Sequence, residues 1–354
     1  MALSRFRKQS IFSDLALVLF SGLLGACFSA IMIRIYQESP FDAGMVRYLA
    51  LGFLTGLGIS SATFAQQHLF ARWQPLPFLF VFLVYPLLLT IQIVVVYSAI
   101  FIALFGVHSY LTEAWILQTI AITFFFTTVI NFIATLSRIL GKNVLRGLLL
   151  GTYHKPVKEN RFVMFLDIAG STSIAERLGD LRFHAFLNDF FRDISEPIVN
   201  CRGEIYKYMG DEAIITWKER SGTTAKAALE VFFHIENAIE KKKDRYLARY
   251  GIAPEFRAGL HYGPLVVGEI GLNKQEIAFS GDVMNTTARI QAECRVVGER
   301  FLVSDDALIR LLGEERTGIL DSSGTGLEIL SRGAAALRGK TKEIGISAVR
   351  QAKA

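Results

Sequence analysis

The chain has 354 residues, 52% of them hydrophobic, and a formal net charge of +6. The excess positive charge lies in residues 1–150, which contain nine Lys or Arg but only four Asp or Glu. The remaining residues are nearly balanced in charge, so the net charge does not indicate a nucleic-acid-binding surface. The three cysteines, Cys27, Cys201 and Cys294, are widely spaced, which argues against a disulfide framework and a structural zinc site.

Four long runs without a charged residue occur in the front part of the chain. They are Leu15–Ile33, Tyr48–Ala71, Trp73–Thr112 and Ala114–Ser137. Because about 20 apolar residues are needed to cross a bilayer core as a helix, each run predicts a transmembrane helix. The third run is longer than one span, and Pro86 within it predicts a kink. This part of the chain is therefore expected to be an α-helical bundle with four spans in a lipid bilayer.

The basic residues predict the orientation of these helices. They precede the first run, separate the second from the third and follow the fourth, at Arg5, Arg7, Lys8, Arg72, Arg138, Lys142 and Arg146. Cytoplasmic loops carry an excess of Lys and Arg, so both ends of the bundle are expected in the cytoplasm. Two arginines in the first outer loop oppose this orientation, but two acidic residues there offset them. The prediction is a multi-pass protein of the inner (plasma) membrane.

The spans contain few polar residues and no Asp, Glu or Lys, which argues against a transporter or channel. Gln92 and Asn131 are expected to form hydrogen bonds between helices rather than to bind a ligand. An anchor, a dimerisation module and a sensor all remain open for this part.

Between the spans and the rest of the chain, apolar residues recur every four positions, at Leu136, Leu140, Val144 and Leu148. Such a helical stripe must be buried, either on the chain's own second half or in a parallel helix pair between two subunits. Pro156 predicts the end of this segment. The predicted domains are a transmembrane domain, 1–136, a helical transducer and linker, 137–160, and a catalytic domain, 161–354.

Two aspartates end or follow strand-like segments of the second half. Asp167 follows the apolar run Phe162–Leu166, and Asp211 lies in a Gly-Asp turn before Ala213–Trp217. A buried carboxylate is costly unless a cation takes its charge, so two of them on neighbouring strands predict an oxygen site for a divalent metal. The alternative is that Asp167 caps the next helix and Asp211 only forms a turn.

Residues near these aspartates suit a nucleotide. Gly170, Ser171 and Thr172 place small residues and free N–H groups at the start of a helix, where phosphate oxygens bind. Lys207 lies four residues before Asp211 on the same strand face and suits a purine ring nitrogen or a phosphate, although an exposed strand lysine would look the same.

A third segment, Gly281–Ile290, predicts a helix with Asn285 and Arg289 on one face. An amide and a guanidinium suit ribose and polyphosphate, but Asn and Arg also often share a solvated face. Near the end of the chain, Lys340 offers another cation beside a glycine.

These motifs together resemble the catalytic domain of class III nucleotidyl cyclases, from about Arg161 to Val349. The resemblance implies a ferredoxin-like α/β domain that acts as a homodimer with active sites across its interface. It implies two metals, Mg²⁺ or Mn²⁺, per site, on Asp167 and Asp211 with the backbone carbonyl of Ile168. It assigns purine selection to Lys207, where guanylyl cyclases carry glutamate. The remaining assignments are ribose orientation, transition-state stabilisation and triphosphate binding, by Asn285, Arg289 and Lys340.

One position departs from the family pattern. The second purine-selecting residue, usually Asp or Thr in adenylyl cyclases, matches Ala278, whose side chain accepts no hydrogen bond. The sequence therefore predicts a membrane-anchored adenylate cyclase that converts ATP to cyclic AMP and pyrophosphate. A guanylate or mixed-specificity cyclase and an inactive nucleotide-binding signalling module are the alternatives.

Overall fold

The protein is represented by a computed structural model, in which the chain forms two compact units, Met1–Leu140 and Gly141–Ala354. The structure describes residues 19, 21–27, 30, 43–70, 78–107, 121, 124–125, 128–129, 132–133, 135–137, 147, 151–219, 222–273, 275–312, 327–335 and 343–351.

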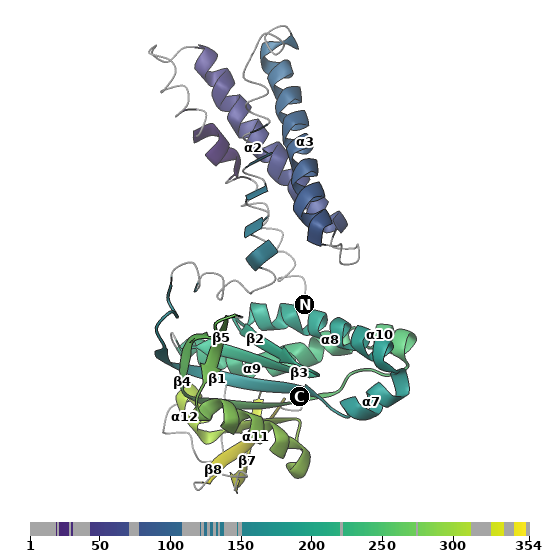
Figure 1. Ribbon diagram of the computed structural model, residues 1–354, viewed down its shortest axis with the longest axis vertical. Helices are drawn as coiled ribbons and strands as arrows, with labels where there is room; N and C mark the ends of the chain where they lie inside the picture. Colours follow the sequence, from purple (N-terminus) through teal and green to yellow (C-terminus); the bar gives the residue numbers. More distant parts are fainter. Residues whose placement is uncertain are drawn as a thin grey trace. The chain divides into compact units, whose positions relative to one another are not determined.

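The first unit contains two long helices that pack against each other, α2 (Ala43–Phe70) and α3 (Phe78–Phe105) (Figure 1). Within the described residues, one helix segment is long and apolar enough to cross a membrane, Pro86–Phe105. The apolar part of α2, Val46–Ser61, is shorter. Only scattered residues of the first and fourth predicted spans are described, so a bundle of four spans remains a prediction.

Small residues bring the helices of this unit close together. A Cβ atom on Gly25 would overlap the carbonyl oxygen of Gly52, and one on Gly56 would overlap that of Ser21. Such close backbone contact is typical of helix pairs in membranes. The Gln92 side chain of α3 donates a hydrogen bond to the Ile59 carbonyl of α2 at 3.4 Å, which confirms the predicted bond between helices. Asn131 lies outside the described residues.

The second unit is built on one sheet with the strand order β2-β3-β1-β4-β6-β8-β7, with β5 paired to β4. The strands are β1 (Val157–Ile168), β2 (Glu204–Met209), β3 (Glu212–Lys218), β4 (Phe256–Ile270), β5 (Glu276–Ser280), β6 (Phe301–Ser304), β7 (Leu327–Ala335) and β8 (Ile344–Gln351). The helices are α7 (Ser171–Leu178), α8 (Asp180–Asn200), α9 (Gly222–Glu240), α10 (Lys243–Tyr250), α11 (Asp282–Val297) and α12 (Asp305–Leu312).

The first four strands form the ferredoxin-like arrangement that the resemblance implies. The order β2-β3-β1-β4 is antiparallel throughout, and helices join β1 to β2 and β3 to β4. Apolar residues that recur at three and four positions predict helices over Leu181–Val199 and Thr223–Lys242. The structure confirms both as α8 and α9, with α7 also preceding the central hairpin. Strands β7 and β8, near the end of the chain, were not predicted.

Strand β1 is apolar along its length because both faces of the sheet are covered. Phe162, Met164 and Leu166 lie in the core formed with α8 and α9. Val163 and Phe165, which alternate with them, lie in a second core that includes Val283 of α11. Figure 1 shows α8 and α11 on opposite sides of the sheet. The apolar run that precedes Asp167 is therefore a buried central strand, as expected.

The structure corrects one strand prediction. The sequence predicts two strands, at 255–261 and 265–270, but β4 continues through Pro264. Proline has no N–H group to donate to a neighbouring strand. On one edge, β4 pairs with β6 at residues 258–260 and with β5 at 266–270, so Pro264 falls in the gap between these ladders. On the other edge it pairs with Asn160 of β1.

Gly259 sets the distance between α11 and the sheet. A Cβ atom at this position would overlap the backbone nitrogen of Gln291 and lie 2.8 Å from its Cα and 2.9 Å from the Thr287 oxygen. These are backbone atoms of α11, which cannot rotate away as a side chain can. The absence of a side chain at Gly259 therefore allows α11 to lie directly on β4.

We expect Gly259→Ala to destabilise the protein by about 1–3 kcal/mol, because overpacking forces the backbone of α11 off the sheet. Gly263→Ala on the same strand is the control, since its Cβ would meet the Val283 side chain at 3.4 Å, an ordinary contact. Thermal unfolding of the purified variants measures the difference. Equal melting temperatures for the two variants would contradict the close approach of α11 to β4.

Candidate active site

The two predicted aspartates lie together at one end of the central strands. Asp167 is the penultimate residue of β1 and pairs across the sheet with Glu212 of β3. Asp211 lies in the turn between β2 and β3, next to Gly210, whose φ of 63° is readily adopted by glycine. The Asp167 and Asp211 carboxyl groups share a hydrogen bond. The prediction that these aspartates come from neighbouring strands is confirmed.

Burial and mutual repulsion dominate the electrostatics of this cluster. Burial, followed by the hydrogen bond and the charge of Asp211, raises the pKa of Asp167 to about 7. Burial and then the charges of Asp167 and Asp211 raise the pKa of Glu212 to about 7. Gln291 of α11 acts in the other direction, because its Nε2 donates a hydrogen bond to Asp167 Oδ2 at 3.3 Å. Without a cation, pKa values of about 7 leave Asp167 and Glu212 each partly protonated at neutral pH.

These properties fit a divalent metal. Carboxylate oxygens are hard ligands, and a cation between them would replace the repulsion that raises their pKa values. Within the part of the chain that the structure describes, no group of three or more His, Cys, Asp or Glu is arranged to hold a metal. Mg²⁺ commonly uses only one or two carboxylates and completes its shell with water and substrate phosphate. Asp167 and Asp211, with the Ile168 carbonyl, would suit such an open site.

The predicted phosphate seat follows Asp167 directly. Gly170 has a left-handed backbone with φ of 71°, and α7 begins at Ser171, as the sequence predicts. No side chain caps this helix start, so N–H groups of its first turn, including those of Ser171 and Thr172, are not satisfied by a cap. Phosphate binding by these groups remains a prediction.

The two predicted base-selecting positions lie on β2 and β5, which do not pair in the sheet but contact each other through aromatic side chains. The Tyr206 ring of β2 stacks on Phe279 of β5 with ring centroids 4.1 Å apart, and the Phe279 N–H donates to the Tyr206 hydroxyl at 3.1 Å. Lys207 follows Tyr206, and Ala278 precedes Phe279. The structure therefore brings Lys207 and the β5 segment around Ala278 into one region.

Asn285 and Arg289 both lie on α11, as predicted, but not beside the aspartates. Gln291, which contacts Asp167, is two residues after Arg289, and two residues turn a helix by about 200°. Asn285 is one helical turn before Arg289 and is exposed. The face of α11 that carries Asn285 and Arg289 is therefore turned away from Asp167 of the same chain. Lys340 lies outside the described residues.

Glu212 and Gln291 belong to the cluster but were not predicted from the sequence. Glu212 directly follows Asp211 and lies opposite Asp167 in the antiparallel pair of β1 and β3. Its position in the sequence next to Asp211 is the signal that could have identified it. Gln291 reaches Asp167 only because α11 folds back over β1 and β4, a contact 124 positions apart in the sequence.

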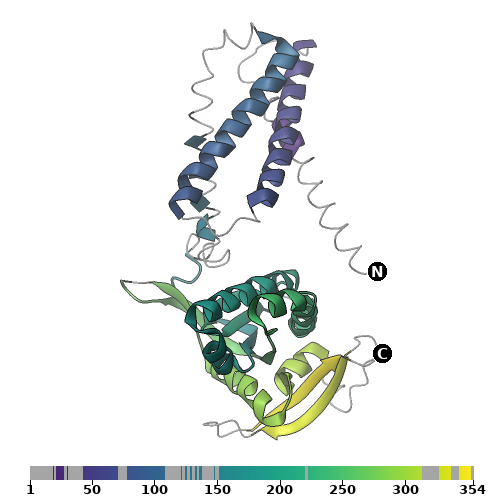
Figure 2. The same cartoon turned by 90° about the vertical axis from the view of Figure 1, so that its right-hand side faces the viewer.

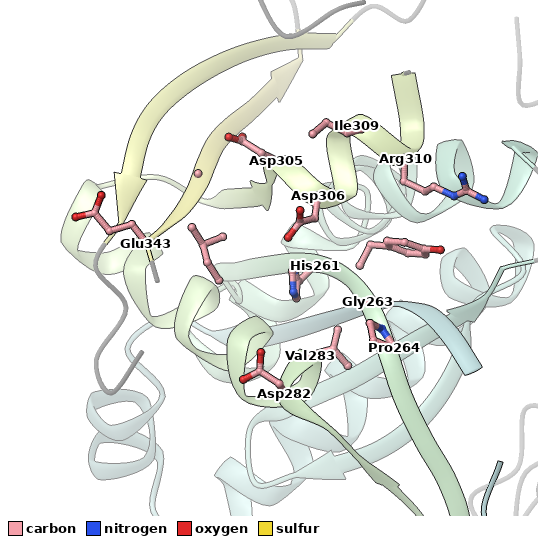
Figure 3. Close-up of a pocket in the computed structure, with 13 residues that line it drawn as sticks. His261, Gly263, Pro264, Asp282, Val283, Asp305, Asp306, Ile309, Arg310 and Glu343 are labelled. Atoms are coloured by element: carbon pink, nitrogen blue, oxygen red, sulfur yellow. The ribbon is translucent and has the colours of Figure 1, made fainter. Parts of the chain in front are cut away.

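A cavity of about 700 Å³ lies elsewhere, between β4, the start of α11, α12 and the start of β8 (Figure 3). Its lining includes His261, Asp282, Asp305, Asp306 and Glu343. His261 is buried inside β4, and its Nδ1 lies 2.7 Å from the Ser304 hydroxyl. A histidine at a strand end is more often structural than catalytic, and this contact supports a structural role for His261. None of the described residues among the predicted site residues lines the cavity.

Residues 153–345 match the family described as the adenylate and guanylate cyclase catalytic domain. The chain is 41% identical to adenylate cyclase 2 of Rhizobium meliloti over 182 residues, 51% of this chain and 50% of that protein. It is 26% identical to a receptor-type guanylate cyclase of Drosophila melanogaster over 213 residues, 58% of this chain and 13% of that protein. The match thus spans half or less of the length of these relatives.

Among solved structures, the chain is similar to a bacterial light-regulated adenylyl cyclase, with a TM-score of 0.54 and 18% identity. This similarity covers 69% of this chain and 69% of that chain, and at this identity it shows a shared fold.

The carboxyl cluster makes stability depend on pH in the absence of metal. The folded pKa values near 7 lie above the value of about 4 expected when unfolded, so protonation favours the folded state. This contribution is complete below about pH 4 and is lost as the pH rises through about 7. We expect the melting temperature in EDTA to fall as the pH rises from about 5 to about 7. Mn²⁺ at pH 8 should restore it.

Asp167→Asn should remove most of both effects, whereas Glu176→Gln, an exposed position on α7, should change neither. The measurement is thermal unfolding of the full chain across this pH range, with EDTA or Mn²⁺. The same pH dependence in wild type and Asp167→Asn would show that this carboxyl does not carry the effect.

Proposed function

The chain belongs to the family of adenylate and guanylate cyclase catalytic domains, and from this we propose that it converts ATP to 3′,5′-cyclic AMP and pyrophosphate. The observation that carries the proposal is the pair of half-buried carboxyls, Asp167 and Asp211, in which burial and the neighbouring Asp211 carboxyl raise the pKa of Asp167. A divalent cation between the two carboxyls would relieve that repulsion. Lys207, a hydrogen-bond donor at the base-selecting position, and the 41% identity to a protein named adenylate cyclase support ATP as the substrate.

In the proposed reaction the ribose 3′-oxygen loses its proton and attacks the α-phosphorus, and pyrophosphate leaves. Two Mg²⁺ or Mn²⁺ ions on Asp167, Asp211 and the Ile168 carbonyl would stabilise the negative charge on the attacking and leaving oxygens. The N–H groups of Gly170, Ser171 and Thr172 would bind phosphate oxygens.

The remaining residues of the chain position the nucleotide. Lys207 would donate to the purine ring, and Asn285 would orient the ribose. Arg289 would bind the phosphates with its planar guanidinium, which forms two parallel hydrogen bonds. Lys340 would bind the triphosphate. Together these groups hold the 3′-oxygen in line with the α-phosphorus, which is most of what such a reaction needs.

We further propose that the enzyme works as a homodimer. Gln291 and Arg289 lie on different faces of α11, and Gln291 faces Asp167 of its own chain. A nucleotide bound at the aspartates would therefore take Asn285 and Arg289 from a second chain. We propose that the same second chain also supplies Lys207. Two equivalent sites per dimer would follow from twofold symmetry.

The front unit is proposed to be a membrane domain of four spans that places the catalytic domain in the cytoplasm. The apolar helix Pro86–Phe105 and the small-residue packing around Gly25 and Gly56 support a membrane environment. The residues that follow, 137–160, would connect this anchor to the catalytic domain, 161–354.

A guanylate or mixed-specificity cyclase is the second candidate. Ala278 offers no side-chain acceptor to an adenine amino group, and guanylate cyclases are among the relatives. An inactive nucleotide-binding module is less well supported, because Asp167, Asp211, Lys207, Asn285 and Arg289 are all retained.

The proposal is tested by incubating the purified full chain with ATP or GTP, together with Mg²⁺ or Mn²⁺, and measuring both cyclic nucleotides. We expect cyclic AMP from the wild type and a loss of a hundredfold or more in Asp167→Asn and Asp211→Asn, because each removes a negative metal ligand. Wild-type protein that forms only cyclic GMP would establish the second candidate. Near-normal turnover by either folded variant would remove that aspartate from the mechanism.

The shared sites are tested by mixing two inactive variants. Asp167→Asn and Arg289→Ala chains should restore activity when co-expressed, to about a quarter of wild type for random pairing, since each heterodimer keeps one intact site. Asp167→Asn with Asp211→Asn is the control and should stay inactive, because in their heterodimer each site retains a defect. Demonstrated Asp167→Asn/Arg289→Ala heterodimers without activity would place each site within a single chain.

A further inference from the structure

We propose that Glu276 supplies the hydrogen-bond acceptor for the adenine amino group, in place of the side chain that Ala278 lacks. This inference rests on the proposed adenylate cyclase activity and identifies a further specificity-determining residue for it.

The alternation of β5 places Glu276 on the face of Ala278. Ile277 packs in the second core with Phe165 and Val267, and Phe279 packs against it. Successive side chains of a strand point to opposite faces, so Glu276 and Ala278 share the other face. Ala278 is 9% exposed, and its methyl group offers only an apolar surface beside the Glu276 carboxylate.

Glu276 already faces the base-selecting lysine. Lys207 Nζ lies 3.7 Å from Glu276 Oε1, and their side chains are 47% and 43% exposed. Exposed ion pairs of this kind contribute little to stability, so a ligand can separate them at little cost. Lys207 and Glu276 thus present a hydrogen-bond donor and an acceptor side by side, and a planar base can bind to both.

Buried contacts hold the two strands that carry this pair. Arg161, 2% exposed, lies with its guanidinium 4.9 Å from the centre of the Phe279 ring and donates to Glu204 at the start of β2. The Phe279 N–H bonds to the Tyr206 hydroxyl, as described above. The backbones of β2 and β5 are therefore fixed beneath Lys207 and Glu276, which limits the entropy lost when a base binds. Figure 2 shows β5 with the end of β4 as a two-stranded arm that projects from the unit.

The chemistry of the pair matches adenine. Adenine presents a ring nitrogen that accepts a hydrogen bond next to an amino group that donates. Lysine has only donors and a carboxylate only acceptors, so Lys207 and Glu276 satisfy both atoms at once. Guanine presents a carbonyl and a ring N–H instead, and the same side chains would have to exchange places to bind it.

The test compares ATP with purine riboside triphosphate, which lacks the amino group, as substrates of the full chain. We expect wild-type kcat/KM to favour ATP by about tenfold, the value of one hydrogen bond to a charged group. In Glu276→Ala this preference should disappear, with the loss confined to ATP and the analogue turned over as before. Glu276→Gln should retain part of the preference, because its amide oxygen still accepts a hydrogen bond.

Glu269→Ala is the matched control. Glu269 is a carboxylate of the same arm, but it pairs with Ile277 and therefore lies on the opposite face. This variant should keep the wild-type ratio of ATP to analogue.

The outcomes separate this inference from the activity on which it rests. If the wild type forms cyclic AMP but Glu276→Ala shows the same preference for ATP over the analogue, the role of Glu276 is overturned. The adenylate cyclase assignment then stays intact. An equal loss for both substrates in Glu276→Ala shows a structural role and also overturns it. Wild-type protein that forms no cyclic AMP overturns the proposed function and the inference with it.

Discussion

The close approach of Asp167 and Asp211 is the constraint on which the site depends. β1 is covered on both faces, so the carboxyl at its end is partly withdrawn from water, and the β2–β3 turn brings the second carboxyl against it. Both cannot be charged at low energetic cost unless a cation lies between them. A divalent metal would therefore contribute to the stability of this end of the sheet as well as to chemistry.

Helix α11 connects this end of the sheet to the other residues that are proposed to bind the nucleotide. Gly259 allows the helix to lie directly on β4, and this close packing fixes which residues face inward and which face outward. Gln291 faces inward and donates a hydrogen bond to Asp167, while Arg289 lies on a different face of the helix. In the proposed mechanism, a complete site would therefore form only when a second chain brings its Asn285 and Arg289 to the aspartates.

Local features of this site could be predicted from the sequence, and long-range ones could not. The strand before Asp167, the Gly210 turn and the start of α7 depend on neighbouring residues whose turn and helix preferences agree. Gln291 reaches Asp167, and Glu276 reaches Lys207, only through the packing of α11 and β5, which no local pattern encodes. The continuity of β4 through Pro264 likewise depends on which neighbouring strands end there.

The same limit explains how a departure from the family pattern can be compatible with activity. In the family pattern, the second purine-selecting position corresponds to Ala278, whose side chain offers no hydrogen-bond acceptor. Side chains two residues apart on a strand point to the same face. A carboxylate at 276 instead of 278 therefore stays on that face, about 7 Å along the strand. A glutamate side chain spans more of that distance than the shorter side chain of aspartate. The ion pair shows that the Glu276 side chain approaches Lys207. In the role proposed for Glu276, selectivity for the base would be retained although its acceptor lies on a different residue of the same strand.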